Sequence, residues 1–355
     1  MRARPGSEPV CIAGIGACTS IGYNAASAAA AVRAGITGFH EHPYMIDKIG
    51  EKMIVGRVPA VSPNLSFADR LSAIALPAAR EALVPFVDRG LSNFPRVRVI
   101  VGLPLTRPGV SAETHRKVCD NLLAEECFRS SELFTFTSGH SGGLMALGAG
   151  CDEINAGNAD FCLIGGVDSY VEPDTLEWLD ANEQLHSEAN TWGFVPGEAA
   201  GFCLLASQRE TERLGLVALG SVVGVATAIE SNLIKTDTVC IGQGLSQSVK
   251  SVLAALPSPE TRISQTICDM NGERYRADEL AFTICRTSER FVDASDFLSP
   301  ADCWGDVGAA SAPLFVSLII AANAKGYSKG QYTLLWTSSE SGERGAAVVS
   351  CGRTN

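Results

Sequence analysis

The stretch Thr135-Phe136-Thr137-Ser138-Gly139-His140-Ser141-Gly142-Gly143-Leu144-Met145-Ala146-Leu147 decides how the rest of this sequence is read. It begins as a short apolar strand, passes through a glycine turn, and continues as a helix that starts on small residues. This layout is typical of a nucleophile turn, in which a reactive side chain is held at the positive end of a helix. The residue at the apex is His140, so an imidazole stands where a nucleophile is expected.

The helix that follows this turn is predicted to be buried. Its first three turns leave little polar surface, because they carry Leu144, Met145, Ala146, Leu147, Ala149, Cys151 and Ile154. A helix that is apolar nearly all round lies in a protein core. Its amino-terminal end would then offer free backbone N–H groups to an anion inside a pocket.

The composition indicates a large folded protein with a subunit interface. The chain has 355 residues, of which 46% are hydrophobic and only 19% are charged. A prior of about 150 residues per domain predicts two similar units or one large fused unit. So few charges favour large buried helices or a subunit contact, and we expect a dimer.

Several classes of partner are not expected. The net charge is −11 and no Lys/Arg run is present, which disfavours nucleic acid. No apolar run approaches the ~18 residues of a membrane span, and residues 1–9 resemble a flexible leader more than a signal peptide. The twelve cysteines form no CxxC pair and the five histidines show no ligand spacing. We therefore expect free thiols in a reducing cytoplasm, with no metal and no cofactor.

Strand-like and helix-like segments alternate along the chain, which predicts an α/β protein with a mixed or parallel sheet. The expected strands are residues 10–16, 96–102, 134–137, 161–166, 201–206, 216–226, 265–269, 331–336 and 346–351. The expected helices are residues 24–34, 68–83, 141–155 and 313–324. A Gly-Glu turn precedes the last strand of each half, at Gly197 and at Gly342. This echo agrees with two stacked copies of one unit, residues 1–210 and 211–355.

Four segments resemble the β-ketoacyl synthases of fatty-acid and polyketide synthesis. They are Val10–Gly22, Val32–Phe39, Ala159–Asp168 and, as the most specific match, Phe194-Val195-Pro196-Gly197-Glu198-Ala199-Ala200-Gly201. The resemblance implies the five-layer αβαβα sandwich of the thiolase fold, built from two related halves and usually assembled as a homodimer. It covers about the first 210 residues well.

The resemblance also implies where the catalytic residues would lie. Members of the family carry an acyl group on a cysteine and use two histidines to assist malonyl decarboxylation. In this sequence the cysteine position falls on His140, the first histidine position on Asn271, and the second on Asp306. The spacings of 131 and 35 residues keep the family's order. The family's supporting lysine falls near Ala301, and its Gly-Phe-Gly-Gly loop is replaced by Ser339-Glu340-Ser341-Gly342.

Chemistry disfavours condensation with these residues. Acyl transfer needs a thiolate or a comparable nucleophile, and malonyl decarboxylation needs donors for the developing enolate. Asn271 could donate, whereas an ionised Asp306 would repel that negative charge. Asp306 could instead form a closed ion pair with a protonated His140. We therefore interpret the chain as a non-condensing subunit that pairs with a copy of itself or with a related ketosynthase. An acyl carrier protein is a further candidate partner.

Two alternatives remain open at this stage. The first is an enzyme, an acyltransferase or thioester hydrolase with altered residues, in which Ser141 of Gly139-His140-Ser141-Gly142-Gly143 is the nucleophile. This pattern also fits the G-x-S-x-G elbow of α/β-hydrolases, but the only later histidine is His186, in a polar stretch. The second is an accessory protein of a bacterial toxin-secretion system, which degenerate proteins of this kind resemble. The remaining histidines, among them His42 and His115, are expected to be solvated.

Overall fold

The structure is a computed structural model that describes residues 9–87, 97–125, 128 and 131–352. The expected leader lies almost wholly outside these residues. Ten strands are hydrogen-bonded into one sheet: β1 (Val10–Thr19), β4 (Val97–Gly102), β5 (Leu133–Phe136), β6 (Phe161–Ser169), β7 (Glu198–Ser207), β8 (Gly220–Ile229), β9 (Gln265–Cys268), β10 (Phe297–Leu298), β11 (Tyr332–Ser338) and β12 (Glu343–Ser350). Their order is β10-β9-β11-β12-β8-β1-β7-β6-β4-β5.

This sheet consists of two copies of one five-stranded pattern. From the centre outward, the first half has the order β1-β7-β6-β4-β5 and the second half has the order β8-β12-β11-β9-β10. In both halves this is the first, fifth, fourth, second and third strand in sequence. The second strands, β4 and β9, are parallel to both of their neighbouring strands. The fifth strands, β7 and β12, are antiparallel to both of their neighbouring strands. The halves meet where β1 pairs with β8 in antiparallel fashion. The prediction of two related halves is therefore confirmed, although the boundary at residue 210 stays a prediction.

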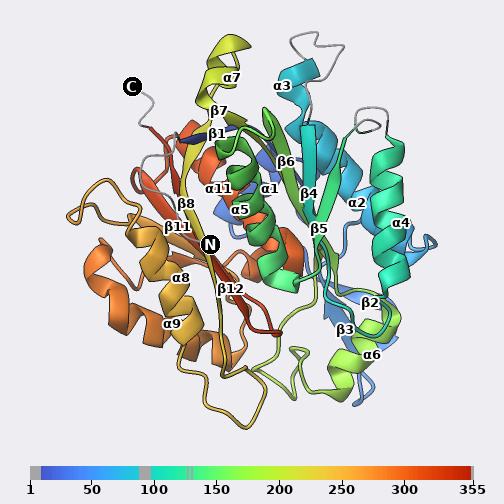
Figure 1. The fold of residues 1–355 in the computed structure, drawn as a ribbon. Helices are drawn as coiled ribbons and strands as arrows, with labels where there is room; N and C mark the ends of the chain where they lie inside the picture. Colours follow the sequence, from blue (N-terminus) through green and yellow to red (C-terminus); the bar gives the residue numbers. More distant parts are fainter. Residues whose placement is uncertain (1–8, 88–96, 126–127, 129–130, 353–355) are drawn as a thin grey trace.

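The longer helices arrange these two halves into five layers (Figure 1). They are α2 (Phe67–Ala82), α4 (Ala112–Ala124), α5 (Gly142–Asn155), α8 (Gln243–Leu253), α9 (Arg274–Thr287) and α11 (Ser311–Ala324). The central layer is α5 and α11, because α5 contacts β4 and β6 on one side and β8 and β12 on the other, and α11 contacts β7 and β11. On the outer face of the first sheet half, α2 packs on β1, β6 and β7 and α4 lies against α2; on that of the second, α8 packs on β8 and β12 and α9 lies against α8. The five-layer sandwich is confirmed.

The shorter elements complete the chain. They are the helices α1 (Ala25–Arg33), α3 (Val84–Val87), α6 (Pro173–Ala181), α7 (Gln208–Arg213) and α10 (Ala301–Trp304), and the strands β2 (His40–Ile46) and β3 (Lys52–Val55), which pair in a separate two-stranded sheet. Among the described residues, no helix is long and apolar enough to cross a membrane.

A tight turn precedes each central helix and explains why the two helices can begin so close together. Gly139 has φ +54° and Gly308 has φ +46°, a left-handed conformation that glycine adopts without the penalty of a Cβ atom. Each glycine opens a three-residue 3₁₀ turn, η2 (Gly139–Ser141) and η4 (Gly308–Ala310), and each turn leads into a helix of 14 residues. Residue 140 therefore stands at the centre of the molecule because of the fold itself.

The most specific family-like segment holds this centre together. Glu198 is fully buried and accepts hydrogen bonds from the Val58 N–H (2.7 Å), the Ser169 hydroxyl (3.0 Å) and the guanidinium of Arg70. The residues just before it form a backbone bridge from Pro196 to Asp306. Glu198 is thus a structural acid, and the segment places Asp306 at the start of η4.

Candidate functional site

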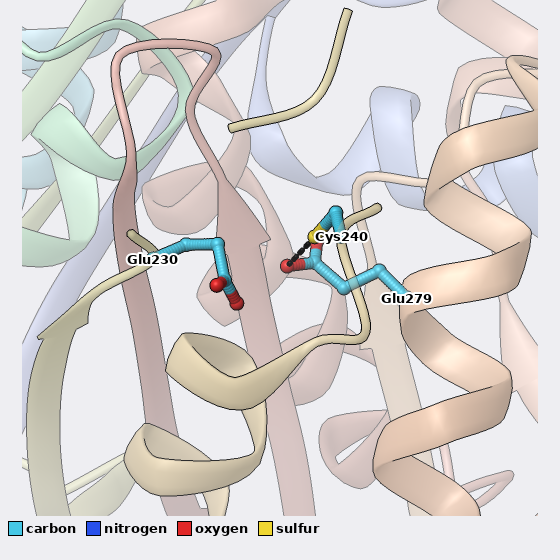
Figure 2. A group of neighbouring side chains, drawn as sticks. All are labelled: Glu230, Cys240 and Glu279. Carbon is cyan, nitrogen blue, oxygen red and sulfur yellow. Dashed lines mark hydrogen bonds between the residues drawn. The ribbon is translucent and has the colours of Figure 1, made fainter. Parts of the chain in front are cut away.

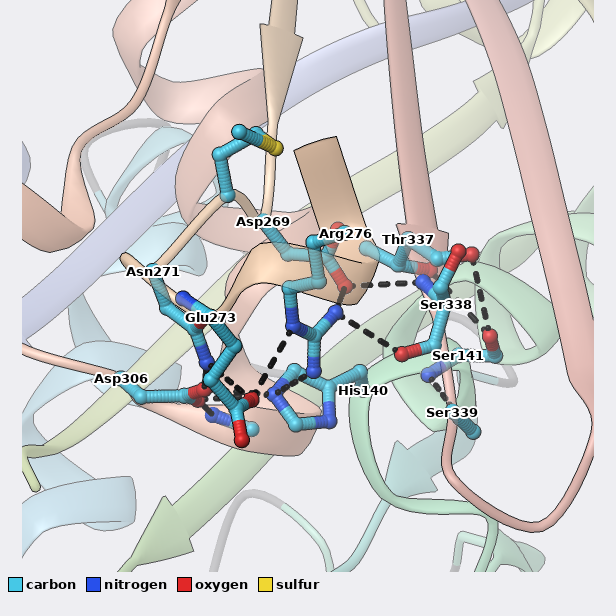
Figure 3. Close-up of polar contacts among 12 residues, drawn as sticks. His140, Ser141, Asp269, Asn271, Glu273, Arg276, Asp306, Thr337, Ser338 and Ser339 are labelled. Atoms are coloured by element: carbon cyan, nitrogen blue, oxygen red, sulfur yellow. Dashed lines mark hydrogen bonds and ion pairs between the residues drawn. The ribbon is translucent and has the colours of Figure 1, made fainter. Parts of the chain in front are cut away.

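The three residues predicted to mark the ancestral site meet in the structure (Figure 3). His140 lies in η2, Asn271 follows β9, and Asp306 precedes η4, yet all three are buried. His140 Nε2 lies 2.8 Å and 2.9 Å from the two carboxylate oxygens of Asp306. Asn271 Nδ2 donates to Asp306 Oδ2 at 2.6 Å. The closed pair of His140 and Asp306, one outcome that the sequence allowed, is therefore what the structure contains.

The environment of this pair favours its charged form. Burial alone would raise the pKa of the Asp306 carboxyl, but the imidazole of His140, Arg276 and the Gly308 N–H hold it well below its usual range. Burial likewise opposes the charge on His140, but the Asp306 carboxylate outweighs it and raises the pKa of the imidazole. Because an ionised carboxylate can only accept, the Nε2–H of His140 is the donor. Both pKa shifts favour the charged form of the pair, an imidazolium and a carboxylate.

A buried arginine and two further acids surround the pair. Arg276 of α9 is fully buried; its Nη1 donates to Asp269 Oδ2 (2.8 Å) and to the Ser338 carbonyl (3.0 Å), and its Nη2 lies 3.2 Å from His140 Nε2. The positive charge of Arg276 lowers the pKa of the His140 imidazole, but by less than the Asp306 carboxylate raises it. Glu273 lies on the far side, with Oε2 3.6 Å from Arg276 Nε.

Charge balance over this group gives independent support for protonated His140. Lys235 reaches the group from outside, with Nζ 2.9 Å from Glu273 Oε1. The carboxylates of Asp269, Glu273 and Asp306 lie beside two permanent cations, Arg276 and Lys235, and Lys235 is shared with Glu340 (2.5 Å). An imidazolium at His140 reduces the excess negative charge of the group, which matters because an uncompensated charge is costly in a buried site. We call Asp269, Glu273, Asp306, Arg276, Lys235 and His140 together with Asn271 the central network.

Asn271 has no donor left for a substrate. Its Nδ2 donates to Asp306 and also to Glu273 Oε2 (3.0 Å), while its Oδ1 accepts from the Glu273 N–H (3.1 Å). An amide has two N–H donors, and both are therefore committed within the central network. The hydrogen bond to a developing enolate, which the sequence left open for this residue, would require one of these contacts to break.

Ser141 is also engaged by the fold. It is fully buried, and its hydroxyl lies within reach of the carbonyls of Glu343 (3.0 Å) and Thr337 (3.3 Å). It makes no side-chain cap of α5, contrary to the simplest expectation for a serine at that place. Its N–H donates to Ser339 Oγ (2.8 Å), and that hydroxyl donates to the Ser138 carbonyl (2.5 Å). One of the free N–H groups expected at this helix terminus is thus already bonded.

A second buried ion pair lies beside the first. Arg107 donates from Nη2 to Asp168 Oδ1 (2.7 Å) and to the Ser169 carbonyl (2.7 Å), and its guanidinium lies over the ring of Tyr170 at 4.0 Å. Asp168 also accepts from the Ala309 N–H at 3.0 Å, so this pair is tied to the turn that starts α11. The Tyr170 ring centroid lies 6.3 Å from that of His140. Ion pairs therefore enclose the imidazole from both halves.

One group of side chains has the composition of a metal site. Glu230, Cys240 and Glu279 bring their ligand atoms within 4.8 Å of one another (Figure 2). Their oxygens already have partners, because Glu230 accepts from the Gly244 N–H (2.8 Å) and Glu279 accepts from Arg344 Nε (2.6 Å). Burial and the neighbouring carboxylates also raise the pKa of the Cys240 thiol, which disfavours the thiolate that a metal requires. These residues fit a salt-bridged core better than a metal site.

The sequence reasoning missed most of the central network. Arg276 and Lys235 were not singled out, and neither were the acids Asp269 and Glu273 on either side of Asn271. The available signal was the acid-rich turn Asp269–Glu273 directly after a buried strand, followed three residues later by an arginine. His42 and His115 were expected to be solvated and are buried instead. The α/β-hydrolase alternative is wrong, because the ten-stranded sheet has the duplicated order described above, and the histidine it would need, His186, is exposed.

Comparisons with known proteins agree with this architecture. Residues 131–211 match the family model for the N-terminal domain of β-ketoacyl synthase. A chain from a complex of a type II polyketide synthase acyl-carrier protein with its ketosynthase bound to the hexaketide has a TM-score of 0.80 and 16% identity. The ishigamide ketosynthase/chain length factor has a TM-score of 0.81 and 16% identity, and both alignments cover 98% of this chain and 100% of the other.

A β-ketoacyl synthase from Burkholderia phymatum has a TM-score of 0.76 at 15% identity, again over 98% of this chain and 100% of that one. No curated protein matches the chain significantly. At such low identities the likeness to solved structures establishes the thiolase-like fold alone. The family match adds that residues 131–211 resemble the N-terminal domain of β-ketoacyl synthase.

Proposed function

We propose that this chain is a non-condensing, ketosynthase-like subunit that acts through a partner. The observation that carries the proposal is the buried pair of His140 and Asp306, 2.8 Å apart at the start of the central helix. By resemblance, this is where a family member would hold its acyl chain and the histidine that assists decarboxylation. An imidazolium bonded to a carboxylate has no free lone pair on Nε2 with which to attack a thioester.

The rest of the central network supports the same conclusion. Decarboxylation of a malonyl group develops an enolate, whose negative charge must be met by preorganised donors. Asp306 presents a carboxylate to that space, and the two N–H donors of Asn271 are committed to acids. Ser141, the alternative nucleophile, is fully buried and bonded to the backbone. A substrate would therefore have to displace several buried, charge-assisted hydrogen bonds before any chemistry could begin.

The proposed partner is a second ketosynthase-like chain, which is either another copy or an active relative. The low charge content supports a subunit contact. The match to a structure named as a ketosynthase/chain length factor shows that this fold also occurs in a protein of that name. We also propose an acyl carrier protein as a partner and the cytoplasm as the location, because a thioester-handling assembly would contain such a carrier and would work there.

A labelling experiment tests the proposal directly. The purified protein is incubated with acetyl and malonyl thioesters of coenzyme A and of an acyl carrier protein. Intact mass reports a covalent adduct, and thiol release reports turnover. We expect neither from the wild-type chain. Turnover that disappears in His140→Ala would overturn the proposal, and turnover that disappears in Ser141→Ala would support the thioester hydrolase instead. A catalytically intact ketosynthase, assayed in parallel, is the positive control.

A further inference from the structure

A groove lined by residues outside the central network has features of a protein-docking surface. It has a volume of about 500 Å³ and is lined by two parts of the chain. One is the β2–β3 hairpin, through Glu41, Asp47 and residues 49–54, and the other is residues 185–188, which follow α6. This hairpin and α6 lie together at one end of the molecule (Figure 1).

The groove carries more negative charge than its own cations neutralise. Glu41 pairs with Lys52, with Nζ and Oε2 2.9 Å apart. Asp47, Glu51 and Glu188 form no ion pair with any described residue, and Glu51 and Glu188 are exposed to solvent. Three carboxylates around one groove therefore present an uncompensated negative field, which low-dielectric walls concentrate.

The same hairpin also exposes large apolar side chains. Ile49 and Ile54 line the groove with 52% and 37% of their surface exposed. Tyr44 and Ile46, on β2, are 77% and 59% exposed. Single exposed apolar residues are ordinary, but four of them on one short hairpin beside a groove favour an interaction site.

The backbone of the hairpin is available as well. Within the described chain, β2 and β3 pair only with each other, so β3 has one edge without a strand neighbour, whereas on β2 the N–H groups of Tyr44 and Met45 donate to His42 Nδ1. An extended peptide could add along such an edge, with alternate side chains facing the groove. The carboxylates would then select the charge of those side chains, and the isoleucines would contact the aliphatic parts.

From these observations we propose that the groove binds an extended, basic segment of a partner protein, in which Lys or Arg alternates with aliphatic residues. The uncompensated carboxylates require cations, the exposed isoleucines require apolar contacts, and the free strand edge requires an extended backbone. Nucleic acids and anionic membranes have the wrong charge for this surface. The proposal does not depend on the proposed function, because none of the groove residues belongs to the central network.

A binding experiment with matched variants tests this proposal. The probe is a fluorescein-labelled peptide of alternating lysine and valine, and its counterpart has glutamate in place of lysine. Binding is measured by fluorescence anisotropy to the wild type and to the double variant Glu51→Lys with Glu188→Lys. The control is Glu260→Lys with Glu289→Lys, which changes two exposed acids of the other half and alters the net charge by the same amount.

We expect the basic peptide to bind the wild type and the control alike, and the groove variant at least tenfold more weakly. Hydrogen exchange should slow at the amides of Lys52–Val55 when the basic peptide is bound. Equal weakening in both double variants would overturn the proposal, because the attraction would then be one of overall charge. Equal binding of the acidic peptide would also overturn it. If sedimentation shows that the groove variant alone loses a dimer, the occupant is a second copy of this chain, and the proposal is wrong.

Discussion

Replacing Asp306 by asparagine should destabilise the fold in a way that depends on pH. The substitution keeps the shape of the side chain but removes the counter-charge of the buried imidazole of His140. Breaking a buried ion pair by removing one partner costs about 3–5 kcal/mol. Unfolding entropy scales at about 2.1 cal/mol/K per residue, or about 0.75 kcal/mol/K for the 355 residues of this chain. The expected fall in Tm is therefore about 4–7 °C.

The sign of the pH dependence follows from the two pKa shifts. The pKa of His140 is raised in the folded state, so its contribution is fully present below the ordinary histidine value of 6.5 and is lost as pH rises through the folded value. The pKa of Asp306 is lowered, so its contribution is present above the ordinary aspartate value of 3.8 and is lost as pH falls toward the folded value. The difference between wild type and Asp306→Asn should thus be largest from about pH 4 to 6.5 and should narrow at higher pH.

A double-mutant cycle supplies the control. Thermal unfolding is followed by circular dichroism from pH 4 to 9 for the wild type, Asp306→Asn, His140→Gln and the double variant. Because the double variant leaves no charge unpaired, we expect it to lose less than the sum of the single changes, with a coupling energy of at least about 1 kcal/mol. A coupling energy below about 0.5 kcal/mol, or the same pH profile in wild type and Asp306→Asn, would refute the ion pair.

Three further changes test other parts of the structure. His140→Cys should leave malonyl decarboxylation undetectable, because Asp306 and Asn271 still stand at the positions of the two family histidines. Measurable release of carbon dioxide would contradict this. Gly308→Ala should lower the unfolding free energy by at least about 2 kcal/mol, since φ is +46° and a Cβ would lie 2.1 Å from Asp168 Oδ2, whereas Gly157→Ala, with open space around it, should lose only about 1 kcal/mol. Glu198→Gln should lower the unfolding free energy, measured in urea, by about 3 kcal/mol, because the buried Arg70 loses its counter-charge. An unchanged urea midpoint would argue against a structural role of Glu198.

The sequence was informative where local pattern and tertiary environment agree. Continuous apolar runs predicted the central strands and the helix at residues 313–324, because a segment that is apolar all round can only be buried. The hairpin at residues 40–55 was not predicted. Its polar residues and Pro43 are typical of a loop, and it forms strands only because Met53 and Val55 are buried against Tyr170 and Phe194. Such a strand depends on contacts that are distant in sequence.

The central network shows the same limit for charged residues. Arg276 lies in a helix whose other charged residues suggest a solvent-facing surface, so nothing local indicates that its side chain is fully buried. Its position makes sense only once Asp269, Glu273 and Asp306 are known to converge on it. By contrast, the amino-acid sequence alone allowed the pairing of His140 with Asp306, because the resemblance gave both residues a place in one pocket. A single sequence does not reveal which charged side chains from different elements meet in the folded protein.

The duplicated architecture changes what the turn at His140 can be taken to mean. Gly308 begins a turn of the same length and conformation before a helix of the same length, yet the residue that corresponds to His140 there is Ala309, which has no reactive side chain. The strand, turn and buried helix are therefore requirements of packing two central helices between two sheet halves, and they occur with or without chemistry. In this fold, a turn of this shape indicates the fold and does not by itself indicate catalysis. Evidence for catalysis has to come from the side chain at its apex, and here the Asp306 carboxylate raises the pKa of that imidazole and forms a buried pair with it.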